Sequence, residues 1–485
     1  MSDKVAFNVT AKDPTSEIFL IDGDFHLVDR GIGSKKFEVP PGIYKIKQRA
    51  ANITSEKLYV VRAGMKDIEL EHVLFASPMP LNDTVKTHEY HQAAARDACG
   101  RVDDAPGAGS AILVVVRDWT SSDHTKVRTE NIPDPSQGLR LRDFAGNEIA
   151  DLEKRAQKNL GPEPCATYRV LVNPGNYRLT LDRPDGTRVE QTIIASNGWE
   201  TQVFLLLEHA KGHAPCADLV HGAITMVPHD SIFNPSSEDL RAEELVRLSL
   251  AEGLTVLPEA LRNRAMNPNA SPMLALLGAH VIIREARNAK EKNAAIDNTG
   301  EVKTIVQNLR AMLGDHPDVE AIAIRAGARN DKYVFTTPPM LRESWASLLR
   351  ASVEIPELIP AQSFCARIAD RIWGDGPWTL WADPDQAAAP GPVWHSSATM
   401  LLQNLSAARP AEAPKESNFV KQFFTKRSRR AFPSGREATR GAATTKVDVQ
   451  QARDLLRDPN KRKEVVRRLG IPISSVNEWL NKLEE

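Results

Sequence analysis

The sequence PGIYKI at residues 41–46 returns as PGNYRL at residues 174–179. In each copy a Pro-Gly turn leads into a run in which apolar and polar side chains alternate. Side chains of a β-strand point alternately to opposite faces of a sheet. Each run therefore predicts a strand with one buried face and one solvated face.

The alternation also predicts which side chains lie on each face. In the first copy Tyr44 and Ile46 oppose three basic residues, Lys45, Lys47 and Arg49. In the second copy the apolar set Tyr177, Leu179 and Leu181 opposes the polar set Arg178, Thr180 and Asp182. An internal repeat governs the architecture of a chain. This one predicts two small β-sandwich modules, at residues 1–75 and 110–208, separated by a connector at 76–109.

The first module carries a family resemblance. After a predicted strand at residues 17–21, the pair Asp22-Gly23 favours a turn with positive φ, and VPPGIYKI follows at residues 39–46. With these pieces, residues 1–75 resemble the PEGA class of small β-sandwich and, more loosely, the carboxypeptidase-regulatory-like sandwiches. The resemblance implies binding or surface presentation rather than catalysis. PEGA domains usually lie outside the cytoplasmic membrane. In this chain residues 1–7 contain no long apolar run, so we expect no signal peptide.

Composition places the chain among ordinary globular proteins. A length of 485 residues exceeds what one core supports, and 41% hydrophobic with 26% charged residues is typical of soluble domains. No apolar run approaches the roughly 20 residues that cross a bilayer. Four widely separated cysteines do not form a disulfide framework. We therefore expect a cytoplasmic protein with no membrane contact.

Helical periodicity begins after a second connector at residues 209–235. Ser236 and the acids that follow predict a capped helix start. Residues 273–283 are apolar nearly all round, which indicates a buried helix. Residues 302–313 show the clearest amphipathic pattern, ended by Gly314, and further helices are predicted at 319–325, after Pro338-Pro339 and across residues 364–373. Residues 236–382 are thus predicted to be an all-α bundle or a short helical repeat. The helical hairpins resemble tetratricopeptide-type repeats without a clean 34-residue period.

The C-terminal part is basic. Sixteen basic and eight acidic residues give residues 421–485 a charge of +8, and the total of −1 leaves −9 for the first 420. Residues 383–446 are rich first in Pro and Ala and then in basic residues, which predicts a disordered linker. A charge split of this kind is typical of a tail that meets an acidic partner and also of a solubilising linker.

Residues 447–485 predict a three-helix unit with helix-turn-helix spacing. Gly470 suits the left-handed turn, and Ser474 or Ser475 caps the second helix. The unit resembles the short helix-turn-helix units of resolvase-like and transposase-like proteins, which implies nucleic-acid binding. The candidate partner- or nucleic-acid-binding residues are Lys461, Arg462, Lys463, Arg467, Arg468, Ser474, Asn477 and Asn481. The second helix also carries Glu478 and ends in two glutamates, which oppose phosphate. Three interpretations of residues 447–485 therefore remain: a DNA-binding unit, a protein-interaction module and an inert capped terminus.

Catalytic signatures are missing from the sequence. We find no glycine-rich phosphate loop after a strand and no Gly-x-Ser-x-Gly elbow. His209, His213, Cys216 and His221 lie close in sequence without a second ligand cluster at zinc spacing. We expect no cofactor, no metal and no catalytic residue.

The sequence as a whole predicts a multidomain α+β chain that acts as a non-enzymatic adaptor or scaffold for protein partners. Its layout is similar to that of components of bacterial conflict or signalling systems. One alternative is a DNA-binding regulator that uses residues 421–485. Another is an enzyme with an unrecognised site near residues 209–221.

Overall fold

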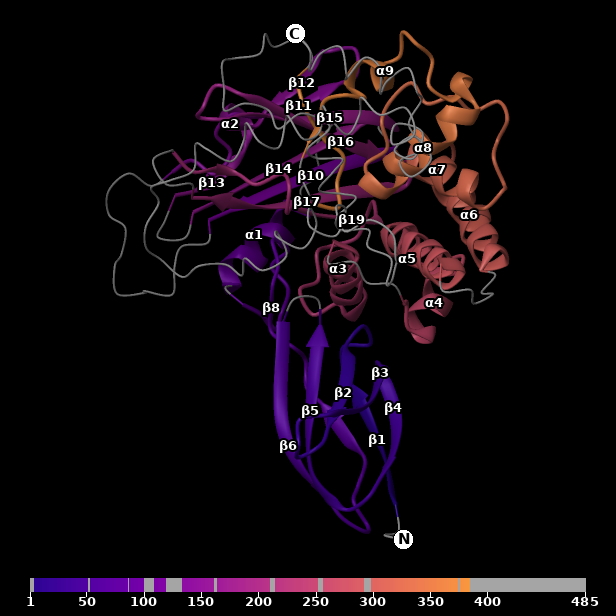
Figure 1. Cartoon of the computed structure of the whole chain (residues 1–485). Coiled ribbons are helices and arrows are strands. Elements are labelled where there is room, and N and C mark those ends of the chain that lie inside the picture. The colour runs from indigo at the N-terminus through magenta and orange to yellow at the C-terminus, as the bar shows by residue number, and fades with distance from the viewer. Residues whose placement is uncertain are drawn as a thin grey trace, which may run out of the picture. The chain divides into compact units, whose positions relative to one another are not determined.

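The computed structural model describes residues 4–50, 53–85, 87–99, 109–118, 133–160, 164–209, 214–251, 256–291, 298–373 and 376–383. This described part is a mixed α and β structure with sheets of seven, six, six and two strands (Figure 1). No described helix is long and apolar enough to cross a membrane. The predicted linker from residue 384 onward and the predicted helix-turn-helix unit, with all eight of its candidate binding residues, lie outside the described residues.

The first sheet, sheet A, is built from the first seventy residues. Its strands run in the order β6-β5-β2-β3-β4-β1-β7. The bounds are β1 Val5–Ala11, β2 Glu17–Ile21, β3 Leu27–Ile32, β4 Ser34–Val39, β5 Gly42–Ala50, β6 Ile53–Val61 and β7 Ile68–Leu70. Tyr44 and Ile46 are buried in a core of their own, as predicted, while Arg49 is exposed. A short parallel pair follows, β8 Phe75–Ala76 and β9 Thr84–Val85.

Two six-stranded sheets face each other across the largest core of the described chain. The first, sheet C, places β10 between β14 and β17, and its strands are β10 Ser110–Arg117, β13 Gln157–Asn159, β14 Cys165–Val172, β17 Trp199–Glu208, β18 Cys216–Ala217 and β19 Ala223–Pro228. The second, sheet D, runs β12-β11-β15-β16-β21-β20, with β11 Leu139–Asp143, β12 Glu148–Asp151, β15 Gly175–Asp182, β16 Arg188–Ala195, β20 Ile372–Trp373 and β21 Leu380–Ala382. Their facing side chains share one apolar cluster with the helices that follow.

The helices begin and end close to their sequence signals. They are α1 Glu89–Cys99, α2 Leu152–Arg155, α3 Glu238–Ala251, α4 Glu259–Ala265, α5 Pro272–Glu291, α6 Thr299–Leu313, α7 Pro317–Arg325, α8 Arg342–Glu354 and α9 Phe364–Ile368, with a 3-10 turn η1 at Pro356–Leu358. Residues 273–277 of α5 are all buried, as its uniformly apolar sequence predicts. Gly314 ends α6 with a φ of 66°.

Three segments differ from the sequence expectations. The predicted helix across 364–373 is wrong beyond Ile368, because residues 372–373 form β20 and pair with β21. The connector expected at 209–235 contains β18 and β19, which extend sheet C. The polar face of β15 is also not solvated: Arg178 and Thr180 are buried, at 6% and 0% exposed. Strands β20 and β21, almost two hundred residues later in the chain, complete sheet D beside β16.

The repeated sequence gives two matching substructures. The strand order β6-β5-β2-β3 of sheet A matches the order β16-β15-β11-β12 of sheet D. In both copies the tyrosine hydroxyl donates to a backbone carbonyl four residues earlier, from Tyr44 to Pro40 at 3.0 Å and from Tyr177 to Asn173 at 2.7 Å. The match therefore extends from sequence to strand order and to the hydrogen bond that fixes the turn.

A buried ion pair joins sheet A to helix α3. The carboxylate of Asp13 is 1% exposed and accepts two hydrogen bonds from the Arg241 guanidinium, at 2.7 and 3.1 Å. The same carboxylate accepts from the backbone N–H of Val73 at 2.7 Å, and the guanidinium lies 4.8 Å from the centre of the Phe75 ring. Burial acts to raise the pKa of Asp13, but these hydrogen bonds outweigh it and hold the pKa below its ordinary value.

Candidate functional site

Exposed apolar side chains gather on the outer face of sheet A. Val60 pairs directly with Ile43, and Leu58 pairs with Lys45 in the next row. Residues paired across antiparallel strands lie on the same face. We name the exposed apolar residues at this end of the sheet, together with those of the adjoining β2–β3 hairpin, the apolar face; they are Phe25, Leu27, Ile43, Leu58 and Val60, each more than half exposed. Grouped apolar side chains of this kind mark interaction sites on protein surfaces.

The most exposed member, Phe25, has a strained backbone. It is 78% exposed and has a φ of 65°, a region that costs a non-glycine residue about 1–2 kcal/mol. The turn is held by Asp22, whose Oδ1 accepts from the backbone N–H of His26 at 2.8 Å. The pair Asp22-Gly23 predicts a positive φ within that pair, but among the described residues of this turn only Phe25 adopts one.

The second copy of the repeat has glycine at the equivalent position. In the β11–β12 hairpin Asp143 Oδ1 accepts from the Asn147 N–H at 2.8 Å, as Asp22 does from His26. The residue before Asn147 is Gly146, with a φ of 97°. Phe25 thus occupies a site where glycine would be free of strain. Strained residues persist where the surrounding structure holds them, and they cluster at functional sites.

The two copies also differ in what covers the outer strand. In sheet D, β21 pairs with β16 through Gln191–Leu380, Glu190–Trp381 and Val189–Ala382. Trp381 donates from Nε1 to Glu190 at 2.9 Å and packs against Phe364. In sheet A the matching strand is β6, which pairs only with β5 among the described strands.

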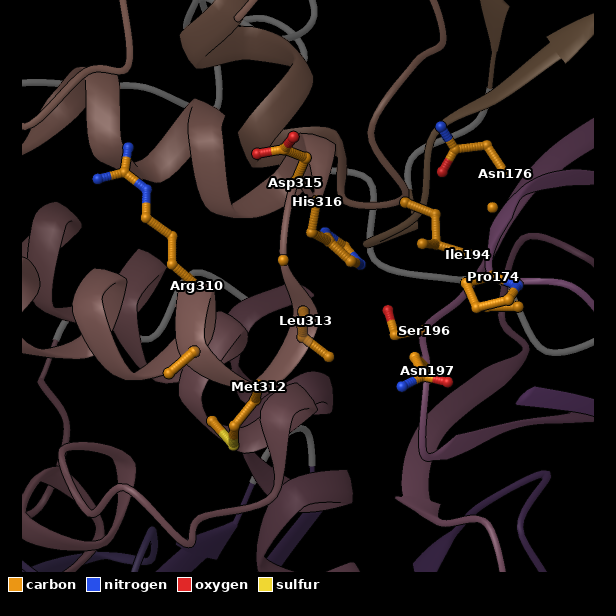
Figure 2. Close-up of a pocket in the computed structure, with 14 residues that line it drawn as sticks. Pro174, Asn176, Ile194, Ser196, Asn197, Arg310, Met312, Leu313, Asp315 and His316 are labelled. Carbon is orange, nitrogen blue, oxygen red and sulfur yellow. The ribbon is translucent and has the colours of Figure 1, made fainter. Parts of the chain in front are cut away.

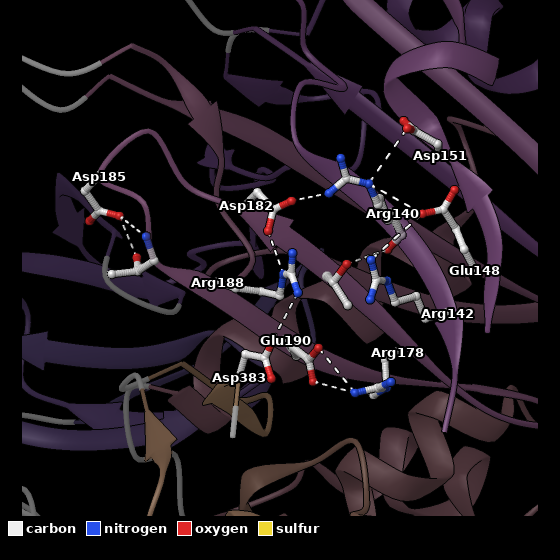
Figure 3. Close-up of polar contacts among 12 residues, drawn as sticks. Arg140, Arg142, Glu148, Asp151, Arg178, Asp182, Asp185, Arg188, Glu190 and Asp383 are labelled. Atoms are coloured by element: carbon white, nitrogen blue, oxygen red, sulfur yellow. Dashed lines mark hydrogen bonds and ion pairs between the residues drawn. The ribbon is translucent and has the colours of Figure 1, made fainter. Parts of the chain in front are cut away.

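Charged side chains hold the covering strand in sheet D (Figure 3). The Arg188 guanidinium donates to Asp182 at 2.6 Å and to Asp383, next to β21, at 3.0 Å. Arg178 pairs with the buried Glu190 at 3.0 Å, and burial raises the pKa of Glu190. Few of these groups are free to contact a ligand, because they pair with one another across the sheet. These ion pairs explain why the polar face of β15, which the sequence predicts to be solvated, is buried.

A cleft of about 530 Å³ lies between the two β-strand ends at residues 174–176 and 194–197 and the α6–α7 turn at 310–316 (Figure 2). His316 caps α7 and is 1% exposed. Its Nδ1 accepts from the Asp318 N–H at 3.2 Å, and Nε2 has no hydrogen-bond partner within the described part of the chain. Burial lowers the pKa of His316 to about 3, so the ring is neutral.

Among the described residues near 209–221, both histidines pair with carboxylates. His209 Nε2 lies 2.6 Å from Asp118, whereas the exposed His221 pairs with Asp218 at 2.7 Å. Cys216 is buried, and burial raises the pKa of its thiol, which disfavours the reactive thiolate. His213 lies outside the described residues. Sequence spacing had grouped these residues, but the His209–Asp118 pair, formed across 91 positions, gave no sequence signal.

No protein-family model matches the chain, and no curated protein matches it. Among solved structures, the Bacillus anthracis TIE protein is 13% identical, with 40% of this chain and 32% of that chain covered and a TM-score of 0.16. The fimbrial anchor protein Mfa2 from Porphyromonas gingivalis is 10% identical, with 46% and 97% covered and a TM-score of 0.12. The chain thus spans about a third of the TIE protein, and neither likeness bears on function.

Proposed function

We propose that this chain is a non-enzymatic adaptor that binds a protein partner through the apolar face of sheet A. The observation that carries the proposal is Phe25, an exposed aromatic residue kept at a strained φ where the second copy of the repeat has Gly146. Aromatic side chains are enriched at protein interfaces and among the residues that contribute most to binding. If the Phe25 ring had no function, a glycine at this position would stabilise the fold by removing the backbone strain.

The occupant that fits is an extended segment of another protein that adds to the edge of β6. Strand β6 is nine residues long and presents Leu58 and Val60 on its outer face. Backbone groups of an edge strand are available for pairing, and added strands are a common mode of peptide recognition. The chain itself shows such an addition, because β21 pairs with β16, the counterpart of β6.

The partner segment should carry a large apolar or aromatic side chain. In sheet D, Trp381 of the added strand lies against Phe364 and Phe144, with centroid distances of 5.7 and 6.5 Å. Arg178 lies 5.7 Å from the Phe144 ring, and Lys45 occupies the same place in sheet A, 5.2 Å from the Phe25 ring. A partner aromatic would therefore meet Phe25 and Lys45.

The rest of the layout supports recruitment. In this proposal the PEGA-like residues 1–75 present the binding surface, and the second module at 110–208, whose outer strand is covered by β21, forms the scaffold together with the helices of 236–382. A linker over 383–446 tethers the three-helix unit of 447–485, which raises the concentration of that unit near a second partner.

The test compares full-length variants of the apolar face. Phe25→Gly removes the ring and the backbone strain, and Leu58→Asp places a charge on the outer face of β6. A display library of short extended peptides selects binders to the native chain, and dissociation constants are measured for each variant. Loss of an aromatic anchor costs about 2 kcal/mol or more, or roughly 30-fold in affinity. Thermal unfolding should show no loss of stability for Phe25→Gly.

The matched control is Ile232→Asn, which removes a side chain that is 61% exposed outside the apolar face. Affinity of this control should equal that of the native chain. The proposal fails if Phe25→Gly and Leu58→Asp bind selected peptides as the native chain does. It also fails if sedimentation shows that a second copy of the chain occupies the face. Salt-dependent retention of the full chain on duplex DNA, with no peptide binding, would support the regulator alternative instead.

A further inference from the structure

We propose that the cleft between the α6–α7 turn and the ends of β15 and β16 binds a small uncharged polyhydroxylated molecule, such as a monosaccharide or a cyclic polyol. This inference goes beyond the adaptor function and concerns different residues. A volume of about 530 Å³ lies within the usual range of ligand pockets and is enough for one or two sugar rings.

The first argument is the buried imidazole of His316. Its Nδ1 accepts a hydrogen bond from the Asp318 N–H, so the proton of the neutral ring resides on Nε2. That Nε2–H is a buried donor with no acceptor among the described residues. Buried donors almost always have a partner, and one that lacks it needs an explanation. Figure 2 shows the ring directed into the gap between the two walls of the cleft.

The second argument is how rigidly the ring is held. His316 is the N-cap of α7, and Pro317 follows at the first helical position. Asp318 in turn accepts from the backbone N–H groups of Met340 and Leu341, at 2.8 and 2.9 Å. The ring therefore cannot rotate to find another acceptor without breaking the start of α7. A ligand oxygen would satisfy the donor without rearrangement.

Among the described residues, the walls of the cleft offer no free cation to an anionic ligand, and the one carboxylate of the lining, Asp315, is directed away from the His316 ring and Ser196 in Figure 2. The guanidinium of Arg310 is bound to Glu320 by two hydrogen bonds of 2.7 Å and extends away from the cleft. The imidazole is neutral, so no free cation faces an anionic group. The hydroxyl of Ser196 is directed toward His316 in Figure 2, and Leu313 and Ile194 supply apolar surface. Hydroxyl groups and C–H faces together match the structure of a sugar or cyclic polyol.

The direct test is saturation-transfer NMR with the full chain. The neutral probes are glucose, galactose, N-acetylglucosamine and myo-inositol, and the anionic probes are inorganic phosphate and citrate. At least one neutral probe should bind, with competition among the neutral probes and none from the anions. Binding of an anion in preference to every neutral probe, or of no neutral probe, would overturn the proposal.

Three variants locate the binding. His316→Asn keeps a favourable N-cap oxygen for Asp318 and removes the Nε2 donor, so affinity should fall about 3- to 10-fold while the fold is retained. Ala311→Trp fills the cleft from an exposed position and should abolish binding. Lys303→Trp changes an exposed residue of α6 that does not line the cleft and should bind as the native chain does. If His316→Asn and Ala311→Trp both bind a probe as tightly as the native chain does, the probe binds outside the cleft and the proposal is overturned. Because none of these residues belongs to the apolar face, peptide binding should be unchanged in all three variants.

Discussion

Breaking the buried ion pair between Asp13 and Arg241 should destabilise the chain strongly. Their side chains are 1% and 6% exposed, and two hydrogen bonds of 2.7 and 3.1 Å join them. Removing one partner of such a pair leaves the other charge buried, which costs about 3–5 kcal/mol. In Arg241→Met the carboxylate keeps its contact with His72 Nδ1 and its bond from the Val73 N–H, both at 2.7 Å, so we expect a cost near the lower end of that range, about 3 kcal/mol.

The double variant Asp13→Asn, Arg241→Met decides whether the cost comes from the unpaired charge. It buries no charge, so its cost should be smaller than the sum of the two single costs by about 1–3 kcal/mol. Urea unfolding of the full chain, followed by circular dichroism, gives the three free energies. The control Glu56→Gln breaks the exposed Lys45–Glu56 pair and should leave the midpoint unchanged.

Acid should act through the same carboxylate. Its folded pKa is depressed, so its contribution to stability is present above the unfolded value of about 3.9 and is lost as the pH falls through the folded pKa. Arg241→Met should weaken that acid sensitivity. Additive single costs, or a cost below about 1 kcal/mol for Arg241→Met, would refute the reasoning, because either result means that water or the neighbouring His72 replaces the missing partner.

Three further measurements test other parts of the structure. Burial raises the pKa of Glu243 to about 7, so stability should fall by about 3 kcal/mol as the pH rises from about 4 to 7, and Glu243→Gln should remove that dependence in pH-resolved urea titrations. Thiol titration with a disulfide reagent should find little reaction before denaturant is added and four thiols afterwards, because every cysteine is buried: Cys99, Cys165, Cys216 and Cys365. Tyr44→Phe and Tyr177→Phe should each lower the unfolding free energy by about 1 kcal/mol, since each removes one hydroxyl-to-carbonyl hydrogen bond; no change in either would mean that ring packing alone fixes the turn.

Local signals in the sequence predicted the elements well. The strand expected at residues 17–21 is β2, and the helix expected over 302–313 is α6 with Gly314 at its end. These features depend on alternation, periodicity and capping within a few residues, which the sequence displays directly.

Features that depend on distant residues could not be predicted. The Asp13–Arg241 pair joins positions 228 apart, and strand β21 reaches β16 across a similar gap. The alternation of polar and apolar residues does not reveal whether another part of the chain will cover the polar face of a strand. The sequence therefore predicts a solvent-exposed polar face for β15, which the structure buries. The cleft is equally invisible in the sequence, because its walls come from two β-strand ends and a helix turn that only the fold brings together.

The duplicated unit separates what the local sequence determines from what the rest of the chain determines. Both copies fold the same four strands and form the same tyrosine hydrogen bond, so the repeated sequence occurs with the same strand order and the same turn each time. The copies diverge at their outer strands. In the second copy, β21 with Trp381 covers the outer strand, and the hairpin turn has the unstrained Gly146. In the first copy, β6 is at the sheet edge among the described strands, and the hairpin turn has the strained Phe25. Since the two hairpins share the same hydrogen bonds, the strain at Phe25 is not needed to close the turn. The difference is explained if the first copy receives from another protein the strand that the second copy receives from itself.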